Sequence, residues 1–164
     1  MEVIAQFLSN YDKKYTTNKF WVLFSIVLLQ QYILMDILEI KEIPMATVLV
    51  IDDSPSEMAK FRDMLAKNNF QVLEASNGEQ GCQMAADHLP DVILMDVVMP
   101  EMNGFQATRK ITRGKTTAHI PVIMISTKNQ ETDRVWGKRQ GAKEYMSKPV
   151  DENGLVNMIR KVME

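Results

Sequence analysis

The chain has 164 residues, 46% of them hydrophobic and 24% charged, which suits one globular domain with a full core and some additional sequence. The net charge of −2 gives no general attraction to nucleic acid or to an anionic membrane. The single cysteine, Cys82, excludes an internal disulfide and a metal site built on two cysteines, so we expect a reducing cytoplasm as the compartment.

From residue 45 onward, short β-branched runs alternate with helical patterns at a steady interval. Ser54 can cap a helix that has Pro55 at its first position and Glu57 three residues after the cap. Asp151 can cap the last helix in the same way. The predicted strands span residues 47–51, 71–75, 91–96, 122–126 and 144–147, and the predicted helices span residues 55–67, 79–88, 105–113, 132–140 and 152–162.

This alternation predicts an α/β fold in which a doubly wound (βα)5 parallel sheet occupies residues 45–164. The flavodoxin-like strand order 2-1-3-4-5 places the first and third strands side by side, at the point where the winding reverses. Open α/β sheets bind their ligands at that point, outside the carboxyl ends of the strands. The residues that follow the strands are therefore the candidate site.

Acidic residues gather at these strand ends. Asp52 and Asp53 follow the first strand, Asp96 ends the third, Ser126 ends the fourth, and Lys148 follows the fifth. Two carboxylates about 4 Å apart repel by roughly 4 kcal/mol at an effective dielectric constant near 20. Three of them together favour a small hard cation such as Mg²⁺. The alternative, that each aspartate only caps the next helix, does not explain three carboxylates and a lysine at one edge.

The motifs "IDDS", "LMDVVMP", "MNG", "MIST" and "SKP", in this order and spacing, resemble the receiver domain of two-component response regulators. The resemblance covers residues 45–164. The stretches "MDVVMPEMNGFQATR", "TKNQETDRVWGKRQGAKEY" and "KPVDE" are more specifically similar to the single-domain, chemotaxis-type regulators of type IV pilus twitching motility. This likeness implies a signalling protein, not an enzyme beyond its own phosphotransfer and dephosphorylation.

The resemblance implies a role for each residue at the strand ends. Asp96 would be the phosphoacceptor and carry an acyl phosphate. Asp53 and Asp96 would bind Mg²⁺ directly, Asp52 mainly through water, and the backbone carbonyl of Val98 would add a further ligand. Lys148 would reach a phosphoryl oxygen. Phosphoryl transfer depends mostly on positioning and on neutralising spread charge, so such a set suffices.

Two further residues are implied as a switch. Ser126 would donate its hydroxyl to the phosphoryl group, and the space it leaves would let Tyr145 rotate inward. The alternative for Tyr145 is a half-buried aromatic that only packs on the fifth strand. Family resemblance also implies a cis bond between Lys148 and Pro149.

Residues around the site bear on the rate at which the acyl phosphate would hydrolyse and on where a partner protein would bind. Val98 and Lys128 offer no carboxylate or amide to orient an attacking water, so slow hydrolysis is expected. Trp136 could anchor a partner protein or cover the sheet edge, and the sequence leaves both readings open.

The implied partners are a histidine kinase of a chemotaxis-like system and a downstream protein target, either a pilus motor or a sister regulator. No nucleic acid is expected. A phosphate sink for a sister regulator remains an alternative. So does an enzyme on the same sheet, a small Mg²⁺-dependent phosphatase or a flavin-binding protein, although "DDSPSE" after the first strand is no Gly-rich phosphate loop.

Residues 1–44 form an N-terminal extension with sixteen uncharged residues between Lys19 and Asp36. A spanning helix normally needs about 20 apolar residues, so this segment is only weakly membrane-like. Lysines precede it and acidic residues follow it, an arrangement that would place the remaining chain outside the cytoplasm. We interpret the extension as an over-extended start before "MATVLVIDDS" and expect a cytoplasmic protein, with a membrane-tethered receiver as the alternative.

Overall fold

The computed structural model describes residues 26–28, 30–31, 45–128 and 130–164. The chain divides into two compact units, Met1–Ile43 and Pro44–Glu164. In the first unit, residues 26–28 and 30–31 are helical, and the other residues of the membrane-like segment lie outside the described residues. Within the described ranges, no helix is both long enough and apolar enough to cross a membrane.

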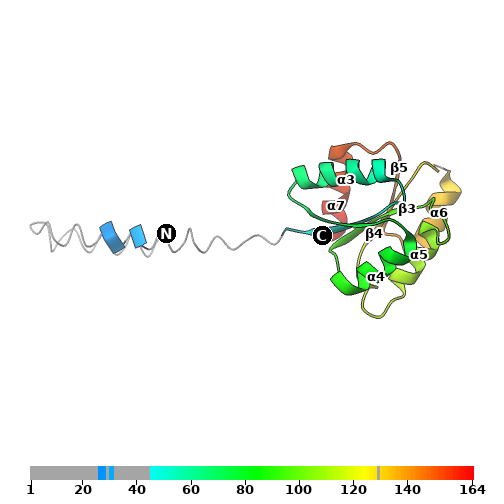
Figure 1. The fold of residues 1–164 in the computed structure, drawn as a ribbon, viewed down its shortest axis with the longest axis horizontal. Coiled ribbons are helices and arrows are strands. Elements are labelled where there is room, and N and C mark those ends of the chain that lie inside the picture. The colour runs from blue at the N-terminus through cyan, green and yellow to red at the C-terminus, as the bar shows by residue number, and fades with distance from the viewer. Residues whose placement is uncertain (1–25, 29, 32–44, 129) are drawn as a thin grey trace, which may run out of the picture. The chain divides into compact units, whose positions relative to one another are not determined.

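The second unit contains one sheet of five parallel strands in the order β2-β1-β3-β4-β5 (Figure 1). This order confirms the predicted doubly wound fold. The strands are β1 (Thr47–Ile51), β2 (Gln71–Ala75), β3 (Val92–Asp96), β4 (Val122–Ser126) and β5 (Glu144–Ser147), and the helices are α3 (Pro55–Lys67), α4 (Gly78–His88), α5 (Gly104–Thr112), α6 (Glu131–Arg139) and α7 (Glu152–Met163).

The helices cover both faces of the sheet, and the side chains of β1 show how (Figure 1). Successive side chains of a strand point to opposite faces. Val48 and Val50 join the cluster that α3 and α7 complete, whereas Leu49 and Ile51 join the cluster that α4 and α5 complete. Since both faces are buried, β1, β3 and β4 are continuous apolar runs up to the point where each strand ends.

Side-chain caps mark the first turns of α3, α4, α5 and α7. Ser54 accepts a hydrogen bond from the amide of Glu57, and Asp151 accepts one from the amide of Gly154, as the sequence predicted. Helix α5 begins at Gly104, one residue before its predicted start, because Asn103 forms a capping box with Gln106. Gly104, which the sequence prediction left outside the helix, is therefore its first residue, and Asn103 is the cap.

The strand register brings the carboxyl ends of the strands to one edge. Ile51 of β1 pairs with Met95 of β3, and Asp96 pairs with Ile125 of β4. Asp52 follows Ile51 directly and remains held to the sheet, since its amide donates to the carbonyl of Ala75 at 3.1 Å. As a result, Asp52 and Asp96 end neighbouring strands at nearly the same level.

Candidate functional site

Lys148 connects two buried carboxylates at the carboxyl edge of the sheet. Its Nζ lies 2.7 Å from Oδ1 of Asp96 and 2.8 Å from Oδ2 of Asp52. Asp52 is 3% exposed and Asp96 is 7% exposed, so bulk water contributes little to the solvation of either charge. One ammonium therefore offsets only part of the negative charge of two carboxylates whose mutual repulsion would otherwise be large.

Backbone amides hold the remaining carboxylate oxygens. The amide of Ser54 donates to Oδ1 of Asp52 at 2.8 Å, and the amide of Val98 donates to Oδ2 of Asp96 at 2.6 Å. Each aspartate thus has one oxygen on Lys148 and the other on a main-chain N–H. The plane of each carboxylate is fixed by the loop that follows its own strand.

The pKa values of this group reflect burial and mutual contact. Burial raises the pKa of Asp96 above its ordinary value, although the hydrogen bond and charge of Lys148 act in the opposite direction. For Lys148, burial favours the neutral form, but the hydrogen bonds that the ammonium donates to Asp52 and Asp96, together with their negative charges, outweigh this effect and raise its pKa. Lys148 is therefore firmly cationic at neutral pH.

The predicted metal ligands do not all converge. Asp53 is exposed, and Val98 is 53% exposed at the surface of the loop after β3. Among the residues that the structure describes, no group of three His, Cys, Asp or Glu side chains could hold a metal ion. The structure joins Asp52 and Asp96 through Lys148, and the third predicted carboxylate stands apart from this group.

The donor chemistry nevertheless fits Mg²⁺. Asp52, Asp53, Asp96 and the carbonyl of Val98 offer only oxygen atoms, the ligands that this hard cation takes in proteins. The two buried carboxylates already face one positive charge, that of Lys148, at under 3 Å. A divalent cation bound at this edge would likewise offset the negative charge of these carboxylates.

Ser126 and Tyr145 lie beside this edge and share one partner. Ser126 is fully buried, and its Oγ accepts a hydrogen bond from the amide of Lys128 at 3.1 Å. The Tyr145 hydroxyl donates to the carbonyl of Lys128 at 2.8 Å, and the residue is only 5% exposed. Burial raises the pKa of this phenol. The ring is therefore inside, and the half-buried position considered from the sequence is not the one observed.

Three features of this region bear on the sequence predictions. The Lys148–Pro149 bond is cis, as the resemblance implied. Trp136 is half exposed on α6, so the two alternatives, anchoring a partner protein and covering the sheet edge, both remain predictions. Arg134, which the sequence analysis did not single out, stacks on the Tyr145 ring. No sequence pattern marks this contact, because Arg134 and Tyr145 belong to different elements.

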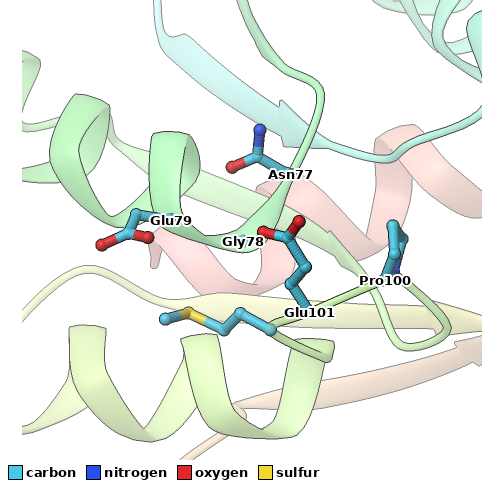
Figure 2. Close-up of a pocket in the computed structure, with 6 residues that line it drawn as sticks. Asn77, Gly78, Glu79, Pro100 and Glu101 are labelled. Atoms are coloured by element: carbon cyan, nitrogen blue, oxygen red, sulfur yellow. The ribbon is translucent and has the colours of Figure 1, made fainter.

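A separate cavity of about 200 Å³ lies between the loop before α4 and the loop before α5 (Figure 2). In the close-up, the side chains of Asn77 and Glu101 lie on either side of Gly78. No predicted site residue lines this cavity. Its lining residues are Asn77, Gly78, Glu79, Pro100, Glu101 and Met102.

Comparison with known proteins identifies the family. Residues 48–160 match the response regulator receiver domain, and the chain belongs to that family. Receiver domains are signalling proteins that histidine kinases phosphorylate and that act on downstream targets. The protein PilH of Pseudomonas aeruginosa is 56% identical over 119 residues, which cover 73% of this chain and 98% of PilH. The predicted family is confirmed, and so is the predicted likeness to a single-domain regulator, since the match covers nearly all of PilH.

Solved structures agree with the observed fold. The chemotaxis protein CheY4 of Vibrio cholerae is 29% identical, with a TM-score of 0.69 over 72% of this chain and 98% of CheY4. The receiver domain of a sensor histidine kinase from Pseudomonas aeruginosa is 24% identical, with a TM-score of 0.68 over 73% of this chain and 98% of that domain. That structure holds a magnesium ion in its active-site cleft.

Proposed function

We propose that Asp96 is the phosphoacceptor and that it receives a phosphoryl group from a histidine kinase of a chemotaxis-like system. The observation that carries the proposal is the buried Asp96 carboxylate at the end of β3, with one oxygen 2.7 Å from the Lys148 ammonium. A carboxylate held in this way is oriented and screened from bulk water, and both properties favour a nucleophile in phosphoryl transfer.

The transfer is balanced by one bond formed and one broken. An oxygen of Asp96 attacks the phosphorus, a P–O bond forms, and the P–N bond to the kinase histidine breaks, with its electron pair returning to the imidazole. Lys148 then shares its charge with a phosphoryl oxygen, and the Ser126 hydroxyl donates to another. Mg²⁺, when bound, neutralises phosphoryl charge, and Asp53, Asp96 and the Val98 carbonyl would hold it, with Asp52 acting through water.

The biological role follows from the similarity to PilH. Because the identity of 56% extends over nearly the whole of PilH, we assign the chain to chemotaxis-like control of type IV pilus twitching motility. Its downstream partner is then a protein, either the pilus motor or a sister regulator, and its compartment is the cytoplasm. Residues 45–164 form the response regulatory domain, and residues 1–44 are an extension to it.

Replacing the nucleophile tests the proposal. We expect Asp96→Asn to fold normally and to lose all labelling by radioactive acetyl phosphate in Mg²⁺, because the amide cannot form an acyl phosphate. Asp87→Asn, an exposed position on α4, is the matched control and should be labelled like the parent. Full labelling of Asp96→Asn would disprove the assignment. The kinase itself is found by phosphotransfer profiling against each histidine kinase of the source cell.

A further inference from the structure

Arg134 of α6 makes two different contacts with one residue of β5. Its guanidinium carbon lies 5.3 Å from the centroid of the Tyr145 ring, within the range of a cation–π contact. Its Nη1 also donates to the main-chain carbonyl of Tyr145 at 3.2 Å. The first contact depends on where the ring points, whereas the second fastens the helix to the strand.

Close packing of the helix explains why Arg134 reaches the ring. Gly137 stands one turn further along the same face of α6. A Cβ added there would lie 3.3 Å from Cδ2 of Tyr145 and 2.9 Å from the sulfur of Met124. The absence of a side chain at Gly137 lets the helix backbone approach the ring, and this brings the Arg134 guanidinium over it.

The contacts form a continuous series from the strand ends to α6. The Oγ of Ser126 accepts a hydrogen bond from the amide of Lys128, and the carbonyl of Lys128 accepts one from the Tyr145 hydroxyl. The guanidinium of Arg134 lies over the Tyr145 ring. Turning the ring outward would break the bond to Lys128 and remove the guanidinium contact together. Both interactions therefore favour the same buried position of Tyr145.

We propose that Arg134 is a positioning residue that holds Tyr145 in its buried position and so couples α6 to the Ser126–Lys128 segment. The proposal rests on the proposed function, because Tyr145 carries a signal only if Ser126 responds to phosphorylation of Asp96. Helix α6, which also carries the exposed Val135 and Trp136, then contacts the Ser126–Lys128 segment indirectly, through Arg134 and the Tyr145 ring.

The test measures how often the Tyr145 ring is exposed in the full chain without a phosphodonor. The protein is labelled with ring-13C tyrosine, the Tyr145 signal is assigned from its loss in Tyr145→Phe, and its relaxation by a dissolved nitroxide is recorded. We expect Arg134→Ala to raise that relaxation roughly two- to fivefold, the range that a cation–π contact at a partly exposed site supports. Arg134→Lys should raise it less, because an ammonium can still lie over the ring.

Arg139→Ala, an exposed basic position on the same helix, is the matched control and should leave the signal unchanged. An unchanged signal in Arg134→Ala, or an equal change in Arg139→Ala, overturns the proposal. If Arg134→Ala does not fold, Arg134→Gln replaces it; the amide keeps a donor for the Tyr145 carbonyl but places no cation over the ring, and the same rise is required.

Labelling by acetyl phosphate is followed in parallel, so that a failure of the Arg134 proposal can be told from a failure of the proposed phosphorylation of Asp96. A parent that is labelled while Arg134→Ala leaves Tyr145 unchanged contradicts the role of Arg134 alone. A parent that is never labelled contradicts the proposed function, and the nitroxide measurement still decides whether Arg134 holds the ring.

Discussion

At the scale of single residues, the site consists of two carboxylates that share one ammonium as their counter-charge. Asp52 and Asp96 are buried, and Lys148 contacts both at under 3 Å. Without Mg²⁺ the group keeps a net negative charge in a region of low dielectric constant, a state that costs stability. The raised pKa of Asp96 expresses this cost, because burial outweighs the favourable contact with Lys148.

Removing that charge should stabilise the metal-free protein. We expect Asp96→Asn, in a chelator at pH 7, to raise the free energy of unfolding by about 1 kcal/mol, at the low end for relieving a buried charge. Lys148 keeps Asp52 as its partner in this variant. The quantity is measured by urea denaturation of parent and variant.

The pH dependence of this difference has a definite sign. Because the pKa of Asp96 is raised in the folded state, the folded protein binds a proton that the unfolded chain lacks between the two pKa values. The stability of the parent therefore falls as pH rises through that interval, and the advantage of Asp96→Asn vanishes as pH falls toward the ordinary pKa of aspartate. An advantage that grew on acidification would contradict the buried-charge account.

The lifetime of the phosphoryl group depends on side chains at the mouth of the site. Val98 is 53% exposed beside the carboxylate that its own amide contacts, and it can neither donate nor accept through its side chain. Lys128 is exposed on the opposite loop. We expect Val98→Asn and Lys128→Glu each to speed loss of phosphate about tenfold, or ~1.4 kcal/mol, by helping to orient a water.

This prediction is checked by the decay of labelled protein in Mg²⁺ after the phosphodonor is removed. Both substitutions leave the main-chain groups of Val98 and Lys128 in place, so the bonds to Asp96, Ser126 and Tyr145 are kept. Decay as slow as the parent's in both variants would show that these side chains do not control lifetime, and would favour the phosphate-sink alternative.

At the scale of elements, the site depends on how closely α5 approaches β3. The amide of Gly104 donates to the carbonyl of Val97 at 3.0 Å, and this contact places the first turn of α5 against the strand end. A Cβ at Gly104 would lie 2.0 Å from the main-chain oxygen of Asp96, which no rotamer change can relieve. The backbone approach requires glycine here.

Gly104→Ala should therefore destabilise the protein by about 2 kcal/mol, although alanine is ordinarily the better helix former. Displacing the main chain of Asp96 should also slow labelling by acetyl phosphate. Gly154→Ala in α7 is the control, since its Cβ would meet only the side chain of Asp151. Thermal unfolding and the labelling rate check both expectations; equal behaviour of the two variants would argue against the close contact at Gly104.

At the scale of the whole molecule, the strand pattern was the most predictable feature. The bounds of β1, β2, β4 and β5 agree with the sequence prediction, and β3 begins one residue later, at Val92. Apolar runs define strands well because burial on both faces leaves no room for polar side chains. Helix starts were less predictable, because an Asn before a Gly reads equally as a turn or as a cap.

The positions of the site residues that follow from strand order could be predicted from the sequence. Their side-chain contacts could be predicted less well. Strand order alone brings Asp52 beside Asp96. The contact of both with Lys148, the outward position of Asp53 and the stacking of Arg134 on Tyr145 depend on rotamers and on helix packing. Single-sequence patterns carry no information on these, since contacts between distant elements leave no local period.

A chain that begins at Met45 should contain everything that the receiver domain needs to fold and to accept phosphate. Among the residues that the structure describes, every strand, every helix cap reported above and every predicted site residue lies in the unit Pro44–Glu164. The contacts described above connect residues of that unit. We therefore expect residues 45–164 alone to fold with a free energy of unfolding within about 1 kcal/mol of the full chain, because the sheet, its helices and the core clusters described above all consist of residues in that range. Labelling of Asp96 by acetyl phosphate in Mg²⁺ should proceed at the same rate in both. Urea denaturation and a time course of labelling measure the two quantities, with Asp96→Asn in the shortened chain as the blank. Aggregation of the shortened chain, or labelling that requires residues 1–44, would make the extension part of the receiver.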